Sequence, residues 1–432
     1  MLRSFFRLPY RGRGLSVAGA SLMLLAACAN STPEASAQPG AQAEPAQASV
    51  EATSAPMDFR SWRDEFRQTA IAAGIAADIF DRAFAAVLEP DAAVIRADRS
   101  QPEFTRPVWE YLDGALSPQR VSNGRRLLAQ HADMLAAIER RYGVDRHVLV
   151  AIWGLESNFG SNMGDRSVIR SLATLAYEGR RPAFAHTQLI EALTILQRGD
   201  VTPEAMVGSW AGAMGQTQFI PSTYNSYAVD FDGNGKRDIW ASSADALASA
   251  ANYLSASNWQ SGQGWGMEVR LGDGFDYALA DMTVRKSVAQ WRELGVRDAR
   301  GNPLDSGLDG QSATLLLPAG HRGPAFLVLN NFRSILRYNN STSYALAIGL
   351  LAERLQGGGQ ILAAWPTADK PLSRSERFEL QELLEARGFQ PGGVDGIIGA
   401  NTREAIRRFQ ISLGWPADGY PTHSLLESLR GG

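Results

Sequence analysis

One glutamate stands out among the residues that could perform chemistry. Glu156 lies in segment 145–160, DRHVLVAIWGLESNFG, where apolar residues recur at three- and four-residue spacing. This spacing predicts an amphipathic helix with Asp145 as its N-cap and Gly160 just past its end. Glu156 would lie in the last turn, where the negative end of the helix dipole and the flanking aromatic rings disfavour ionisation. We therefore expect a raised pKa and a general acid; a solvated glutamate at a helix end is the alternative.

A second stretch carries polar amides beside aromatic rings. Segment 209–224 reads SWAGAMGQTQFIPSTY, with four small residues before a run that contains Gln218 and Phe219. The small residues allow a close backbone approach, and the amide of Gln218 offers both a donor and an acceptor. Such a surface suits a sugar. A glycine-rich turn before a helix that starts at Pro221 would explain much of the same pattern.

The elements around these stretches are mainly helical. Residues 122–143 predict one helix capped by Ser122 and ended by Gly143, and 189–196 and 247–254 predict two more. Short apolar runs at 267–271, 313–317 and 324–329 predict strands. We expect a mainly α fold with a small β-containing insertion.

The N-terminus predicts a secretory signal. Four arginines precede an apolar run, 15–27, that is too short for a membrane-spanning helix, and Cys28 closes it. Leu25-Ala26-Ala27-Cys28 resembles a bacterial lipobox, which implies a signal peptide over 1–27 and lipidation of Cys28. With Ala29 next, the resemblance implies an outer-membrane lipoprotein facing the periplasm. An inert cysteine in an ordinary cleaved signal is the alternative.

Composition divides the rest of the chain. Residues 28–57 have almost no large apolar side chain, so they predict a flexible tether. Residues 58–365 have the composition of a globular domain, 366–372 form a linker, and 373–432 have their own periodicity. The net charge is −3 without a basic block beyond the signal, which argues against nucleic acid as a partner.

The last segment contains a weak internal repeat. Asp395-Gly396 and Asp418-Gly419 are turn signals, and each precedes a predicted helix capped by threonine. This pattern predicts a compact three-helix unit over 373–432. The segment resembles the small peptidoglycan-binding domains that accompany wall-degrading enzymes; a helical bundle without a ligand is the alternative.

Three ordered motifs carry a further resemblance. LES-x-F-G at Glu156, AGAMGQTQFIPSTY after it and RYNNSTSYA at 337–345 resemble the membrane-bound B-type lytic murein transglycosylases over about residues 58–365. The resemblance implies a lysozyme-like catalytic fold. It also implies cleavage of the β-1,4 bond between N-acetylmuramic acid and N-acetylglucosamine without water, leaving 1,6-anhydromuramic acid ends, in cell-wall turnover.

The resemblance also assigns site residues. Glu156 matches the family's acid and base. Sugar-contacting positions of the family fall on Ser209, Gln218, Tyr253, Tyr338 and Asn339, and less securely on Tyr111. A tyrosine of some relatives is Phe184 here, which keeps a stacking face but loses the hydroxyl.

The residue count agrees with this chemistry. Hydrolysing glycosidases generally use two carboxylates, and only Glu156 is well placed. The 2-acetamido group of the substrate can stabilise the anomeric cation instead. Asp165 is a candidate partner that a turn explains better. A lysozyme-type hydrolase on the same fold and an inactive wall-binding scaffold are the alternatives. We expect a monomer that binds glycan strands and needs no cofactor for its chemistry.

Segment 230–241 predicts a structural calcium site. Asp230, Asp232, Asn234 and Asp238 repeat the EF-hand spacing, with glycine at position six and Lys236 at position seven. Ala241 replaces the usual glutamate at position twelve. Relatives close the site with a later aspartate, for which Asp245 is the nearest candidate. A metal-free turn before a helix is the alternative.

Overall fold

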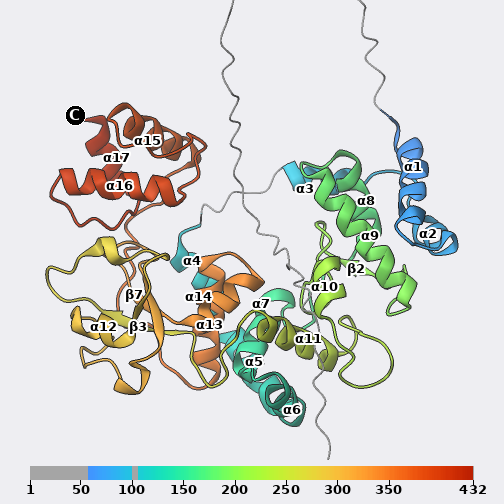
Figure 1. Ribbon diagram of the computed structural model, residues 1–432, viewed down its shortest axis with the longest axis horizontal. Coiled ribbons are helices and arrows are strands. Elements are labelled where there is room, and N and C mark those ends of the chain that lie inside the picture. The colour runs from blue at the N-terminus through green and yellow to red at the C-terminus, as the bar shows by residue number, and fades with distance from the viewer. Residues whose placement is uncertain (1–56, 100–105, 432) are drawn as a thin grey trace, which may run out of the picture. The chain divides into compact units, whose positions relative to one another are not determined.

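A computed structural model describes residues 57–99 and 106–431 (Figure 1). The described residues belong to one compact unit, residues 55–432. The predicted signal peptide 1–27, Cys28 and nearly all of the predicted tether 28–57 lie outside them. Within the described part, no helix has the length and apolar character needed to cross a membrane.

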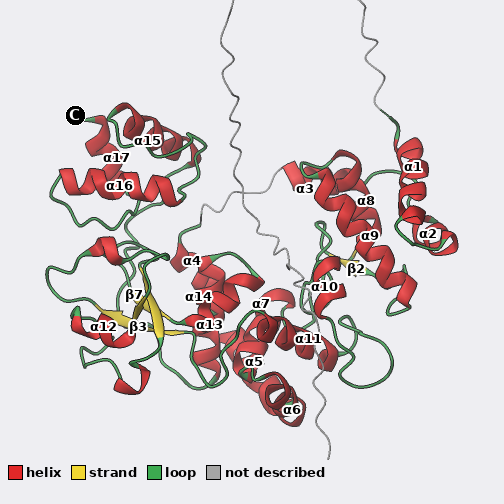
Figure 2. Cartoon of the chain, viewed as in Figure 1, coloured by secondary structure: helices red, strands yellow, loops and turns green. Residues whose placement is uncertain are grey.

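Helices make up most of the described chain, and strands gather in two places (Figure 2). The helices that precede the C-terminal module are α1 (Phe59–Ala72), α2 (Ala77–Phe84), α3 (Ala92–Arg99), α4 (Val108–Ala115), α5 (Pro118–Gln130), α6 (Ala132–Tyr142), α7 (Arg146–Ser157), α8 (Val168–Glu178), α9 (Pro182–Arg198), α10 (Pro221–Tyr227), α11 (Ser243–Ala256), α12 (Val288–Glu293), α13 (Asn330–Tyr338) and α14 (Thr342–Leu355), with 3₁₀ turns η1 (Tyr277–Leu279) and η2 (Ser306–Leu308). The mainly α expectation is confirmed.

The helix predicted over 122–143 is wrong in its start and its continuity. The Ser117 side chain caps α5 by accepting from Arg120 N, and Pro118 occupies the first helical position, which suits proline. The backbone of His131 (φ −109°, ψ 25°) then leaves the helical region, so α5 ends and α6 begins. Gly143, at φ +70°, ends α6 as predicted.

The strands form two antiparallel sheets. The smaller pairs β1 (Arg166–Ser167) with β2 (Val207–Gly208). The larger has the order β4-β6-β7-β3-β5, from β3 (Gly266–Arg270), β4 (Lys286–Ser287), β5 (Arg297–Asp298), β6 (Ser312–Leu316) and β7 (Ala325–Val328). The three longer strands match the predicted runs closely. β4 and β5 have two residues each, which is too short for an alternating pattern to be recognised.

Several apolar cores hold these elements. One joins α4–α7 with α11, α13 and α14, and another joins α1 and α2 with α8–α10. Tyr253 and Tyr338 pack against both of these helical cores. A third core, with fully buried Trp291, lies at the larger sheet. The two tyrosines therefore mark where the helical cores meet.

The C-terminal module is the predicted three-helix unit, with α15 (Arg374–Ala386), α16 (Ala400–Ser412) and α17 (His423–Arg430). Its separate core contains Leu380, Phe409 and Leu426. Thr422 caps α17 as expected. Thr402 does not cap α16, which begins at Ala400. Its buried hydroxyl instead contacts the Pro391 carbonyl at 3.1 Å.

Candidate active site

Glu156 occupies the last turn of α7. Asp145 caps the start of this helix by accepting from His147 N at 2.7 Å, as predicted. After Ser157 the chain takes three successive left-handed residues, Asn158 (φ 47°), Phe159 (φ 60°) and Gly160 (φ 81°). This conformation is uncommon for residues other than glycine. It turns the chain away from the helix directly after the glutamate.

The Ser157 hydroxyl holds this turn in place. It is 1% exposed, donates to Gln216 O at 2.7 Å and accepts from Gly160 N at 2.9 Å. The Gln216 side chain in turn donates to Trp240 O at 3.1 Å. The end of α7 is therefore tied to the 209–219 loop and, through Gln216, to the end of the predicted calcium loop at Trp240.

Burial raises the pKa of Glu156 to about 7. The Tyr344 hydroxyl donates to Glu156 Oε1 at 2.5 Å, and this hydrogen bond acts in the opposite direction. Tyr111 and Tyr338 also have raised pKa values, first because they are buried and second because the charge of Glu156 is near. Three tyrosines thus surround one carboxyl group that is partly protonated at neutral pH.

Among the described residues, no second carboxylate acts on the pKa of Glu156. Asp165, the candidate partner, is an exposed residue in the loop between α7 and β1. The arrangement supplies one partly buried proton donor, and within the described part of the chain no second carboxylate stands beside it to serve as a nucleophile or base.

The 209–219 loop folds back on itself. Met214 and Phe219 exchange backbone hydrogen bonds of 2.8 and 3.1 Å, and the Ser209 hydroxyl accepts from Ala211 N and Ala213 N. Gly212 has φ +83°, and a side chain there would collide with Leu172. The small residues therefore permit the tight packing that the sequence predicted.

Two predicted sugar contacts lie in this loop. Gln218, at φ 50°, donates its amide to Met163 O at 3.0 Å and to Gly215 O at 2.9 Å. Its carbonyl oxygen accepts nothing from the described residues. Ser209 Oγ already accepts hydrogen bonds from backbone N–H groups, so its O–H can still act as a hydrogen-bond donor. Gln218 is thus equipped to accept from a sugar and Ser209 to donate.

The predicted tyrosines form one aromatic cluster. The rings of Tyr253 and Tyr338 meet edge to face at 5.2 Å, and Phe219 lies within 6 Å of both. Their hydroxyls donate to Arg337 O at 2.5 Å and Thr217 O at 2.8 Å, so each phenol oxygen can still accept. Asn339 is exposed directly after α13. The structure places Tyr111 and Tyr338 near Glu156.

Tyr344 was missed as a site residue. It lies on α14 within the RYNNSTSYA motif, five residues beyond Asn339, and is 4% exposed. The motif was the available signal. Phe184 is half-buried on α9, with the Arg181 guanidinium 4.9 Å above its ring.

Three carboxylates converge at the predicted calcium loop. Asp230, Asp232 and Asp245 each place one oxygen within 4.8 Å of the others. Asp245 is fully buried and accepts from Phe231 N, Asp232 N and Asp238 N at 2.8 to 3.2 Å. Burial, with a contribution from Asp232, raises its pKa despite these three bonds.

The other predicted ligands have partners of their own. Asn234 Oδ1 accepts from Lys236 N at 2.9 Å, and Asp238 Oδ1 accepts from Trp240 N and Ala241 N. Asp238 does not belong to the converging group. A buried carboxylate beside two others is a costly arrangement that a hard cation with oxygen ligands would relieve, so the donor set fits calcium.

The sequence matches two known families. Residues 58–353 match the transglycosylase SLT domain, and residues 373–429 match the putative peptidoglycan binding domain. A curated relative, membrane-bound lytic murein transglycosylase B of Escherichia coli (strain K12), is 34% identical over 259 residues, which are 58% of this chain and 68% of that protein.

The chain also resembles solved protein structures. SltB3 from Pseudomonas aeruginosa, in complex with NAG-anhNAM-pentapeptide, is 66% identical with a TM-score of 0.85, covering 86% of this chain and 99% of that one. Escherichia coli Slt35, in complex with calcium, is 29% identical with a TM-score of 0.58, covering 68% and 92%.

Proposed function

The chain belongs to the transglycosylase SLT domain family, and from that membership we propose that Glu156 serves alone as the acid and then the base of its reaction. The protein is a peptidoglycan lytic transglycosylase. It cleaves the β-1,4 bond between N-acetylmuramic acid and N-acetylglucosamine and leaves a 1,6-anhydro end.

The reaction needs one group that first gives a proton and then takes one. Glu156 protonates the glycosidic oxygen as the bond to the anomeric carbon breaks, and the 2-acetamido oxygen stabilises the cation that forms. The 6-hydroxyl then attacks the same carbon, and its proton returns to Glu156. Atoms balance without water, and no second carboxylate is required.

The observation that carries this proposal is the environment of Glu156. Its pKa of about 7 leaves a large protonated fraction at neutral pH, and Tyr344 fixes one of its oxygens at 2.5 Å. A general acid is most effective with a pKa near the working pH. We assign sugar contacts to Ser209, Gln218, Tyr253, Tyr338, Asn339 and Tyr111.

Glu156→Gln tests the assignment, because an amide of the same shape cannot transfer the proton. Release of muropeptides from sacculi should fall on the order of 10²–10⁴-fold or more with an unchanged melting temperature. Glu110→Gln, at an exposed neighbour of Tyr111, is the matched control.

Mass spectrometry of the wild-type products separates this reaction from hydrolysis, since anhydro ends lack one water relative to reducing ends. Activity of Glu156→Gln within about threefold of wild type would place the acid elsewhere.

We also propose that the loop from Asp230 to Asp245 holds a structural calcium ion. Asp230, Asp232 and Asp245 would supply carboxylate oxygens. The Asn234 side-chain oxygen and the backbone carbonyl of Lys236 would add to them, and Asp238 would join only if its side chain moved toward the other three. Calcium would tie the loop to α11 and take no part in the chemistry. The support is the buried carboxylate cluster, together with a calcium complex of Slt35.

The cell location follows from the N-terminal sequence alone. We propose that Cys28 is lipidated and anchors the protein in the outer membrane, facing the periplasm. The curated relative is named membrane-bound, which agrees with an anchor. Cys28→Ser should move the protein from the membrane fraction to the soluble periplasm. Equal membrane recovery of both proteins would argue against the lipid anchor.

The C-terminal module is proposed to hold the enzyme on the wall. Binding at an insoluble substrate raises the effective concentration of the catalytic residues there, without altering the bond-breaking step. The match to a putative peptidoglycan binding domain supports this role.

A further inference from the structure

The two Asp-Gly turns of the module are built in the same way. Gln381 accepts from the two N–H groups of the first turn at 3.1 and 2.7 Å, and donates to Asp395 Oδ1 at 3.1 Å. Gln410 accepts from the glycine N–H of the second turn at 2.8 Å, and donates to Asp418 Oδ1 at 2.7 Å. The sequence repeat is therefore also a repeat of geometry.

In the second turn the other aspartate oxygen binds a peptide segment of the chain itself. Asp418 Oδ2 accepts from His321 N at 2.8 Å and from His321 Nδ1 at 2.6 Å. The Asp418 side chain is 3% exposed. Gly320 approaches so closely that a Cβ there would lie 2.8 Å from Oδ2. The molecule thus displays what a turn of this module can bind: a peptide backbone N–H with an adjacent side-chain donor.

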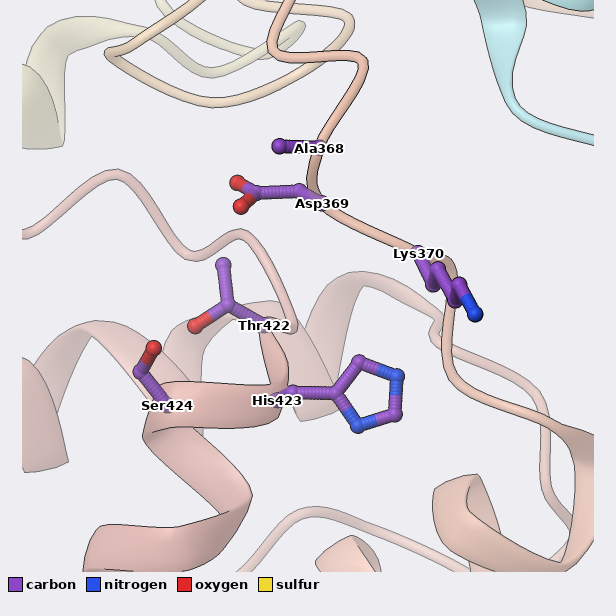
Figure 3. Close-up of a pocket in the computed structure, with 6 residues that line it drawn as sticks. All are labelled: Ala368, Asp369, Lys370, Thr422, His423 and Ser424. Carbon is purple, nitrogen blue, oxygen red and sulfur yellow. The ribbon is translucent and has the colours of Figure 1, made fainter.

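Other loop and linker residues of the chain also lie around the second turn, Asp418-Gly419. A cavity of about 300 Å³ lies where Ala368, Asp369 and Lys370 face the start of α17 (Figure 3). Asp369, on its rim, forms an ion pair with Arg322, next to His321. Loop and linker residues of the chain therefore occupy this side of the module.

The first turn, Asp395-Gly396, has the same kind of carboxylate acceptor, but no peptide segment of the described chain binds to its outer oxygen. Asp395 is exposed, and within the described chain its Oδ2 accepts no hydrogen bond. A cavity of about 340 Å³ opens on the same loop and the adjoining α16, lined by Gln390, Gly392, Asn401, Glu404 and Arg408. These residues offer both charges and two amides, but no aromatic face for a sugar ring to stack on.

We propose that the Asp395–Gly396 turn and this cavity bind the stem peptide of peptidoglycan. Asp395 Oδ2 accepts peptide N–H groups as Asp418 Oδ2 does. Glu404, which also pairs with Arg407, and Arg408, which also donates to Phe389 O, supply charges of both signs for the amino and carboxylate groups that stem peptides carry. The inference deepens the proposed wall-binding role of the module and rests on it. SltB3, the relative at 66% identity, is solved with a pentapeptide-bearing fragment.

Asp395→Asn is a sharp test because it is isosteric. The amide oxygen can take the place of Oδ1, which accepts from Gln381 and from Ile397 N, while the amide nitrogen replaces the outward acceptor with a donor. Glu385→Gln removes the same charge from an exposed site on α15 and is the matched control. All proteins are full chains that carry Glu156→Gln, so that walls are bound but not digested.

Sedimentation is measured with intact sacculi and with glycan strands freed of stem peptides by an amidase. Asp395→Asn should weaken binding to intact sacculi about tenfold, as expected for a hydrogen bond to a charged group, and leave binding to bare strands unchanged. Free stem pentapeptide in excess should reduce binding of the parent to the level of the variant. Arg408→Gln should reproduce the loss if Asp395→Asn lowers the melting temperature.

Three results would overturn the proposal. Equal binding of parent and variants to intact sacculi would mean that this turn binds nothing. Equal loss on intact and bare strands would make the ligand the glycan. Loss with Glu385→Gln as well would mean that only net charge matters. Failure of the proposed reaction is a separate result, visible as missing anhydro products from the chain with Glu156 intact.

Discussion

At Glu156 two effects on the proton oppose each other. Burial disfavours the carboxylate and raises its pKa, whereas the Tyr344 hydrogen bond favours the carboxylate and lowers it. Burial prevails, and the pKa settles at about 7. Tyr344 therefore fixes one oxygen of the proposed acid and lowers its pKa, which would help the same group to act as a base in the second step.

This balance predicts a pH dependence. The acid must be protonated at the start, so kcat/KM should fall as the pH rises through about 7. Tyr344→Phe removes the bond that favours the carboxylate, so the pKa should rise further and the alkaline limb should move to higher pH. The rate at its optimum should fall roughly tenfold through lost positioning. Initial rates on soluble glycan fragments between pH 5 and 9 measure both.

Tyr177→Phe is the matched control, because it removes a hydroxyl on α8 that donates to Met57 O at 2.7 Å. Its pH profile should overlay that of wild type. An alkaline limb that stays in place in Tyr344→Phe would show that the hydrogen bond does not tune the acid.

The sequence predicted the raised pKa but not the group that limits it. Glu156 and Tyr344 are 188 positions apart, on α7 and α14, and periodicity carries no information about which helices meet. The physical cause of the raised pKa of Glu156 also differed in part from the predicted cause. The sequence argument relied on the helix end and neighbouring rings, whereas burial is the largest cause in the folded protein, with Tyr111, Tyr338 and Tyr344 around the carboxyl.

At the scale of the elements, the loop before α11 is held both by hydrogen bonds between residues close in sequence and by hydrogen bonds to the more distant Asp245. Asp230 accepts from Gly233, Asn234 and Gly235 N–H groups, which the Asp-x-Asp-Gly spacing made predictable. Asp245, from the first turn of α11, closes the loop with three more bonds. The sequence could propose Asp245 only by resemblance, because its distance from the loop departs from the EF-hand pattern.

Calcium should stabilise this loop by mass action. After chelation, calcium at about 100 times its Kd should add about 2.7 kcal/mol to the free energy of unfolding and raise the melting temperature. Asp232→Ala should abolish the rise. Asp276→Ala, which removes a similar turn bond to Ala278 N away from the loop, should preserve it. A chelated wild type whose melting temperature ignores added calcium would leave only a metal-free turn.

The predicted start of α5 was wrong because two serines could each have capped the helix. Ser117 and Ser122 both precede apolar periodicity, and the Ser117-Pro118 pair determines the start of α5 because proline is suited to the first helical position. The three longer strands were predictable from apolar runs. The pairing that places β3 between β7 and β5 was not, since it joins segments far apart in the chain.

At the scale of the whole molecule, the module is attached by more than its linker. The Arg407 guanidinium, 8% exposed, donates to Asp281 Oδ2 at 3.0 Å and Ala280 O at 3.2 Å. Asp418 of the module also accepts a hydrogen bond from His321 N at 2.8 Å. Composition predicted a separate domain after a short break. It could not predict this contact, because the charged residues that form it look like ordinary surface residues in sequence.

Asp418→Asn tests the attachment by reversing one acceptor. The amide nitrogen would face the backbone N–H of His321, which then loses its acceptor, so the interface should lose about 1–3 kcal/mol while both parts keep their cores. Calorimetry should resolve two transitions where wild type has one, and protease should cut the linker at 366–372 faster. Turnover of short soluble fragments should barely change, because Glu156 and its tyrosines lie in the preceding domain. Asp273→Asn, at an exposed residue in the loop after β3, is the control. A single unchanged transition in Asp418→Asn would mean that the His321 contact does not couple the module to the catalytic body.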